Sequence, residues 1–94
     1  MFVAMCSEEE RMDKRLGFVG IIVEDRMKSA PLVNDVLTQY GSCIVARTGI
    51  PYAQKSCCVI TLVVDATNEE LGDMTGRLGR LPGVSVKSAL SKGK

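Results

Sequence analysis

Residues 16–23 and 56–64 of this chain are apolar at almost every position and rich in β-branched side chains, which predicts two strands. Successive side chains of a strand point to opposite faces of its sheet. One parity of the first segment holds Leu16, Phe18 and Ile22, and the other holds Val19, Ile21 and Val23. A strand with one wet face would alternate with charged residues. These two strands hardly alternate, so both faces of their sheet need a cover.

A helix is predicted after the first strand. Ser29 is a candidate N-cap, Pro31 would lie in the first turn, and Gly41 is well placed to end the helix. Apolar residues recur between them at helical spacing: Val33, Val36, Leu37 and Tyr40. This pattern predicts an amphipathic helix with one buried stripe.

A second helix is predicted after the strand at residues 56–64. Thr67 and Glu70 have the spacing of a capping box, in which side chains and backbone N–H groups satisfy one another. One face of the helix then carries Leu71, Met74, Leu78 and Leu81. Pro82 and Gly83 end the helix.

Two shorter strands complete the pattern, residues 43–47, punctuated by residues 48–51, and residues 84–89. The order β-α-β-β-α-β predicts an α+β fold of the ferredoxin-like type, an antiparallel four-stranded sheet with two helices on one face. At 94 residues the chain fits one domain. We expect a leader at residues 1–13, the domain at 14–90 and a polar tail at 91–94.

The two helices can cover only one face of this sheet. We therefore expect a homo-oligomer, a dimer or a tetramer, that buries the second face, which includes Phe18 and Val59. Gly72, Gly76 and Gly79 fall on one flank of the second helix, where glycine costs roughly 0.5–1 kcal/mol each relative to alanine. They predict close contact with another backbone; the alternative is a weakly specified surface helix.

Composition excludes several functions. The net charge of +1 and the scattered aromatic residues do not favour nucleic-acid binding. The chain has no histidine, the commonest general base and metal ligand, and it has no nucleotide-binding glycine motif. We expect no enzymatic activity, no cofactor, no metal and no membrane span. Cys57 and Cys58 would point to opposite faces of their strand, so core filling is the preferred role; Cys43 is unassigned. Without a secretory signal, we expect a cytoplasmic protein.

Two segments are candidates for ligand binding. The first is the turn after the first strand, with Asp25, Arg26, Lys28 and Ser29, because a helix N-terminus attracts anions. The second holds Arg47, Gly49 and Pro51, where an arginine beside a flexible turn suits a carboxylate or phosphate. The alternative in each case is a solvated surface loop.

Residues 20–26, 47–52 and 78–87 together resemble the small iron-only hydrogenase system regulators. This is an ACT-like group related in fold to the C-terminal domain of the nickel-responsive regulator. The resemblance implies an ACT-type plait, oligomerisation and a regulatory role near [FeFe]-hydrogenase genes. Nickel sensing is not implied, because that regulator binds the metal mainly through histidines. Residues 1–13 are too short for its DNA-binding domain, so control of transcription would need a protein partner.

The leading hypothesis is thus a regulatory module that binds a small anion, an amino acid or a protein partner. An assembly accessory without a small ligand is the alternative. A hydrolase of the acylphosphatase type is the third hypothesis, in which Arg26 would help to hold a phosphate. Glu24 and Asp25 precede Arg26, and an acidic loop is poorly suited to that role.

Overall fold

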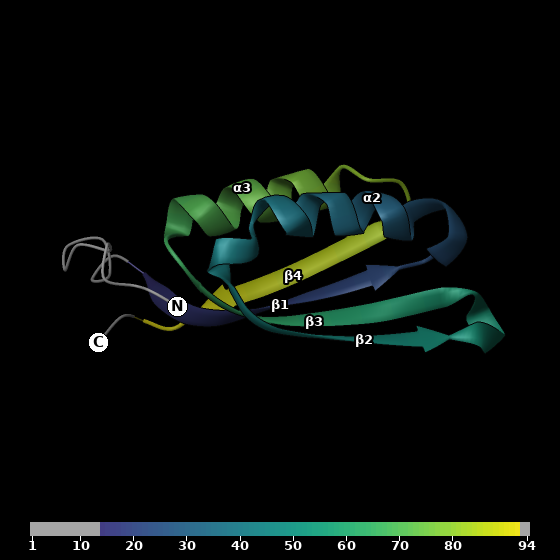
Figure 1. Ribbon diagram of the computed structural model, residues 1–94, viewed down its shortest axis with the longest axis horizontal. Coiled ribbons are helices and arrows are strands. Elements are labelled where there is room, and N and C mark those ends of the chain that lie inside the picture. The colour runs from purple at the N-terminus through teal and green to yellow at the C-terminus, as the bar shows by residue number, and fades with distance from the viewer. Residues whose placement is uncertain (1–13, 93–94) are drawn as a thin grey trace.

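The computed structural model describes residues 14–92 and forms two layers, a sheet and a pair of helices (Figure 1). Its elements follow one another as β1 (Arg15–Val23), α2 (Arg26–Gln39), β2 (Ile44–Tyr52), β3 (Cys57–Ala66), α3 (Asn68–Gly79) and β4 (Val84–Leu90). Short 3₁₀ turns, η1 (Gly41–Cys43) and η2 (Ala53–Lys55), flank β2. The predicted leader and residues 93–94 lie outside the described residues.

The four strands form one sheet in the order β2-β3-β1-β4, with every neighbouring pair antiparallel. In the centre of the sheet Ile21 lies between Ile60 of β3 and Val86 of β4. Both helices lie on the same side of this sheet (Figure 1). The ferredoxin-like βαββαβ plait predicted from the order of the elements is therefore confirmed.

The core lies between the helices and one parity of each central strand. The buried parity is Val19, Ile21 and Val23 in β1, with Cys58, Ile60, Leu62 and Val64 in β3. The helices supply Val33, Leu37, Leu71, Met74 and Leu78. This division of the apolar residues between two faces is the one that the strand parity predicted.

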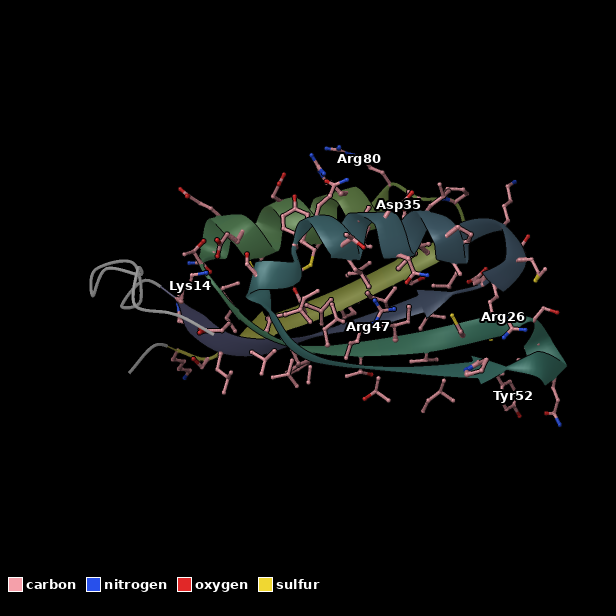
Figure 2. The ribbon with its side chains drawn as sticks, viewed as in Figure 1. Lys14, Arg26, Asp35, Arg47, Tyr52 and Arg80 are labelled. Atoms are coloured by element: carbon pink, nitrogen blue, oxygen red, sulfur yellow. The ribbon has the colours of Figure 1, made fainter. Side chains whose placement is uncertain are left out.

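The other parity forms the side of the sheet without helices, which we call the open face. It carries Leu16, Phe18, Gly20 and Ile22 of β1, Cys57, Val59, Thr61, Val63 and Asp65 of β3, Ala46, Thr48, Ile50 and Tyr52 of β2, and Ser85, Lys87 and Ala89 of β4. Figure 2 shows Tyr52 on this side, directed away from the helices. Most of the open face is apolar, yet nothing in the described chain covers it.

The N-terminus of α3 is as predicted. Thr67 Oγ1 accepts a hydrogen bond from the backbone N of Glu70 at 3.0 Å, and Glu70 Oε1 accepts one from the backbone N of Thr67 at 2.9 Å. The start of α2 is not as predicted. The helix begins at Arg26, and its N-cap is Asp25, whose carboxylate accepts from Lys28 N at 3.3 Å. Asp25 reaches this position because the helix follows β1 with almost no intervening loop.

Strand β2 is longer than the sequence pattern indicated. Residues 48–51 were predicted to interrupt it, but they continue the pairing with β3 as far as Tyr52. Gly49 and Pro51 are tolerated there because β2 is an edge strand with one side unpaired. The register shifts between Ile44 and Ala46, which indicates a bulge at Val45.

Candidate functional site

The border between α2 and β2 holds most of the predicted ligand-binding residues. Arg47 lies on the helix-facing side of β2, paired with Leu62 of β3. Its guanidinium Nη2 donates to the side-chain oxygen of Asn34 on α2 at 2.9 Å. The Arg47 side chain is exposed, and among residues 14–92 only Asn34 accepts a hydrogen bond from it, so the other N–H donors of the guanidinium can face a ligand.

Gly49 follows Arg47 on the same side of β2. A Cβ placed at Gly49 would have one neighbouring atom within 4 Å, Ile60 Cγ1 at 3.9 Å. Pro51, two residues further on, is also exposed. The helix-facing side of β2 is therefore uncovered beyond Arg47, which leaves room beside this side chain.

The start of α2 borders the same flank of the molecule. The backbone N of Arg26 donates to the carbonyl oxygen of Ser56 at 3.0 Å, which ties the helix start to the end of the β2–β3 hairpin. Lys28 is exposed in the first turn of the helix. Figure 2 shows Arg26 near the hairpin and Arg47 further along the sheet, beside α2. The two segments proposed from sequence thus border one surface, which we call the α2–β2 flank.

Two of the predicted site residues have structural contacts instead. Ser29 is fully buried, and its hydroxyl donates to the carbonyl oxygen of Pro82 at 2.6 Å. Its partner lies in the turn before β4, so the structure places Ser29 away from the α2–β2 flank. Asp25 caps α2 through its carboxylate. Arg26 and Arg47 then remain as cations on this flank, with Lys28 exposed in the same first turn of α2, and they favour an anionic ligand there.

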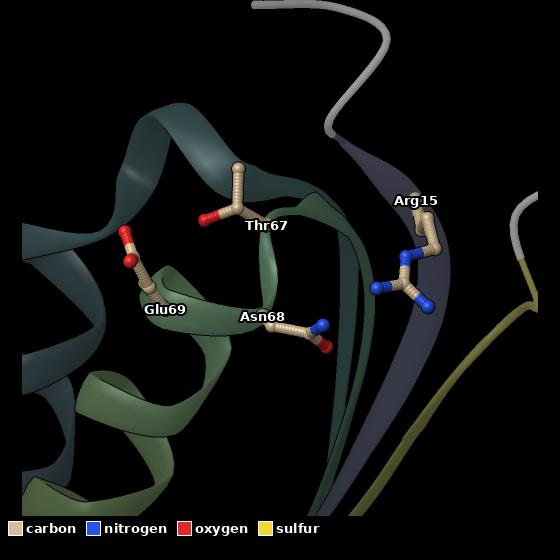
Figure 3. A pocket seen from close by; sticks show the side chains of 4 residues that line it. All are labelled: Arg15, Thr67, Asn68 and Glu69. Carbon is tan, nitrogen blue, oxygen red and sulfur yellow. The ribbon is translucent and has the colours of Figure 1, made fainter.

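Sequence reasoning did not find the hollow at the N-terminus of α3. A cavity of about 280 Å³ there is lined by Arg15 of β1 and by Thr67, Asn68 and Glu69 (Figure 3). The hydroxyl of Thr67 serves the helix cap, and Arg15 Nη1 donates to the carbonyl oxygen of Ser91 at 3.3 Å. Glu69 adds a negative charge to the same hollow. This hollow is therefore a weaker candidate for anion binding than the α2–β2 flank.

The residues predicted to make subunit contacts lie on two surfaces. Phe18 and Val59 belong to the open face and are exposed. Gly72, Gly76 and Gly79 are exposed on α3, and a Cβ at any of them would have no neighbour within 4 Å. No backbone of the described chain approaches this glycine stripe, so its role in contacts between copies stays a prediction.

The cysteines lie in separate environments. Cys58 faces the core and Cys57 belongs to the open face, as the strand parity predicted. Burial raises the pKa of the Cys43 thiol, and the nearby Glu70 carboxylate raises it further. Among residues 14–92, no group of three or more cysteine and carboxylate side chains is arranged to hold a metal ion.

Comparison with known proteins identifies relatives of this chain. A family model, TM1266-like, described as "Iron-only hydrogenase system regulator, putative", matches residues 15–88. Among solved structures, the uncharacterized protein TM1266 from Thermotoga maritima is 35% identical, with a TM-score of 0.80. The similarity covers 84% of this chain and 99% of that one. No functionally curated protein matches the chain.

More distant structures share the fold alone. The C-terminal domain of MgtC from Mycobacterium tuberculosis is 15% identical, with a TM-score of 0.65 over 87% of this chain and 94% of that one. A formyltetrahydrofolate deformylase from Pseudomonas putida is 9% identical, with a TM-score of 0.57 over 79% of this chain and 28% of that one. Within the described residues, neither helix has the length and hydropathy needed to cross a bilayer.

Proposed function

Because this chain belongs to the TM1266-like family of iron-only hydrogenase system regulators, we propose that it is a regulatory module that binds its effector without transforming it. The regulatory part of this proposal is supported by the description of the family. The proposal that this role depends on binding rather than catalysis rests on the residues of the chain, above all on the α2–β2 flank.

Arg47 is the observation that carries the proposal. Its guanidinium is oriented by Asn34, and the strand beside it is uncovered at Gly49 and Pro51. A planar guanidinium held in this way suits a carboxylate or phosphate, which it can bind through two parallel hydrogen bonds. We therefore propose a small anion or an amino acid as the effector, bound beside Arg47 with Arg26 and Lys28 contributing positive charge.

Catalysis is less well supported by the same surface. Its polar groups are the cations, the amide of Asn34 and the carboxylates of Glu24 and Asp25, of which Asp25 caps α2. A hydrolase of the acylphosphatase type would need Arg26 to hold a phosphate next to these carboxylates, which repel it. Hydrolysis of acetyl phosphate that disappears in Arg26→Ala would contradict the binding proposal.

A thermal-shift screen tests the proposal directly. The full chain is titrated with amino acids, inorganic phosphate and nucleotides, and we expect at least one class to raise Tm because a ligand that binds only the folded state stabilises it. Arg47→Ala should abolish this shift. Arg80→Ala, which removes an exposed arginine after α3, should leave it unchanged. A response that survives in Arg47→Ala would move the ligand away from the α2–β2 flank.

A second candidate function is an assembly accessory that binds a protein and no small ligand. The observation that favours it is the open face, which is apolar and uncovered in the single chain. Under this alternative, none of the ligand classes shifts Tm. Native mass spectrometry then detects a defined complex with a protein of the hydrogenase system, and this complex is lost in Phe18→Glu and retained in Arg47→Ala.

A further inference from the structure

The open face exposes more apolar surface than a small monomer normally does. Its large apolar side chains are exposed by fractions from 38% at Val63 to 59% at Leu16. With full areas of roughly 150–250 Å² for such residues, they expose roughly 650 Å² in one continuous patch. The largest apolar patch on a typical monomer covers only about 300–600 Å². A standard interface takes about 800 Å² from each partner, which this patch and its polar rim can supply.

The charges on the open face complement one another. Among its described residues there is one acid, Asp65, and one base, Lys87. Lys87 lies on the edge strand β4, and Asp65 lies near the end of β3. Two copies that meet through this face bring together equal numbers of both signs. The net charge of +1 also gives two copies little reason to repel each other.

The same face carries a protruding aromatic ring beside a hollow. Phe18 is 56% exposed. Next to it lies a cavity of about 420 Å³, whose lining is almost entirely apolar and consists of Leu16, Gly17, Phe18, Val63, Ala89, Leu90 and Ser91. Ala89, which lies directly across from Phe18 on β4 and has a short side chain, is part of this lining. Buried aromatic anchors that fill such hollows dominate the energy of many interfaces.

We propose that a second copy of this chain covers the open face about a twofold axis, with Phe18 of each copy seated in the hollow of the other. A twofold interface requires one surface that complements itself. The adjoining ring and hollow, together with one acid and one base on the same face, meet this requirement. A different protein would have to supply both a ring and a hollow of its own.

Pairing through the β2 edge of the sheet is less favourable. Strand β2 carries a bulge at Val45 and a proline at position 51, and both features obstruct addition of another strand. The helix-facing side of β2 points the other way from the open face. A dimer through the open face therefore leaves the α2–β2 flank accessible, and this inference does not depend on the proposed ligand.

Sedimentation velocity of the full chain over a range of concentrations tests the pairing. We expect the wild type to sediment as a dimer or as a dimer of dimers. Phe18→Glu should weaken association at least ~100-fold, since each interface loses two anchors and gains two buried charges. The matched control is Leu32→Glu, which places the same charge at an exposed apolar residue of α2 and should associate like the wild type. Equal weakening by both changes would overturn the proposal.

A second variant distinguishes specific insertion of Phe18 into the hollow from nonspecific hydrophobic association. Ala89→Leu fills the hollow while it adds apolar surface to the open face. If Phe18 enters the hollow, Ala89→Leu weakens association at least ~10-fold. If association depends only on apolar surface, Ala89→Leu associates as tightly as the wild type or more tightly. This variant also decides the matter if Phe18→Glu fails to fold, which far-UV circular dichroism would show. A wild type that remains monomeric at 100 μM, or dimers unaffected by Ala89→Leu, would overturn the proposal.

Discussion

At the scale of single residues, Ser29 and Arg47 show how burial separates polar side chains that look alike in sequence. Both were candidates for ligand binding. Ser29 is fully buried and donates to the carbonyl oxygen of Pro82, so it joins α2 to the turn before β4. Arg47 is exposed and is oriented by one neighbour, Asn34. Only the second arrangement leaves hydrogen-bond donors for a ligand.

The first prediction concerns Ser29. Ser29→Ala removes the hydrogen bond that the buried hydroxyl donates to the carbonyl oxygen of Pro82, and such a bond contributes about 0.5–1.5 kcal/mol. We expect the free energy of unfolding in urea to fall by this amount. Ser88→Ala, at an exposed position of β4, should change it by less than about 0.5 kcal/mol. Equal effects of the two changes would show that the Pro82 contact is not stabilising.

The second prediction compares two glycines. A Cβ at Gly17 would collide with the carbonyl oxygen of Ala89, a backbone atom that cannot move aside easily. Gly17→Ala should therefore destabilise the fold by roughly 1–3 kcal/mol. A Cβ at Gly76 meets no neighbour within 4 Å, and alanine is the better helix former. Gly76→Ala should stabilise the fold by roughly 0.5–1 kcal/mol, as measured by urea unfolding.

The glycine stripe on α3 gives this comparison a second readout. If Gly72, Gly76 and Gly79 contact another copy, Gly76→Ala should stabilise the isolated fold and still weaken association. If these glycines contact no other copy, Gly76→Ala will sediment like the wild type.

At the scale of elements, the N-terminus of α3 links a sequence signal to pH dependence. The backbone N–H of Thr67 donates to the Glu70 carboxylate and lowers the pKa of that carboxyl; burial opposes this effect, and Lys14 at 3.4 Å adds to it. A lowered pKa in the folded state means that the ionised carboxylate stabilises the fold. This stabilisation is present above the ordinary pKa of 4.5 and is lost as the pH falls through the lower folded value.

The third prediction follows from the lowered pKa of the Glu70 carboxyl. The wild type should lose more unfolding free energy between pH 7 and pH 3 than Glu70→Gln does, because glutamine cannot ionise. Glu69→Gln changes an exposed neighbour outside the capping box and should lose as much as the wild type. Urea unfolding at both pH values measures the difference. A loss that is the same in the wild type and Glu70→Gln would contradict a role for the ionised carboxylate.

The two helices also differ in how well their starts could be predicted. Thr67 and Glu70 satisfy each other within one turn, so the α3 cap is a local signal that sequence reveals. For α2, both Asp25 and Ser29 are good cap residues by type. Packing decided between them, because the hydroxyl of Ser29 bonds to a residue 53 positions away. Likewise, the extension of β2 to Tyr52 depends on its pairing with β3.

At the scale of the whole molecule, two layers cannot cover both sides of a sheet whose central strands are apolar throughout. The fourth prediction follows. If a second copy covers the open face, Tm should rise with protein concentration, because mass action favours the folded dimer over unfolded chains. Calorimetry at about 10 and 200 μM compares the two conditions. In Phe18→Glu, Tm should no longer depend on concentration, whereas in Leu32→Glu it should respond as in the wild type.

The sequence by itself determined the order of the elements, the cap of α3 and the division of β1 and β3 into two apolar faces, because each of these depends on residues close together along the chain. It also proposed Arg47 as a candidate ligand-binding residue. Only the tertiary structure decided that Ser29 is enclosed, that β2 extends to Tyr52, and that the start of α2 and residues 47–51 border one flank. These outcomes depend on which distant segments meet, and sequence spacing does not encode such contacts.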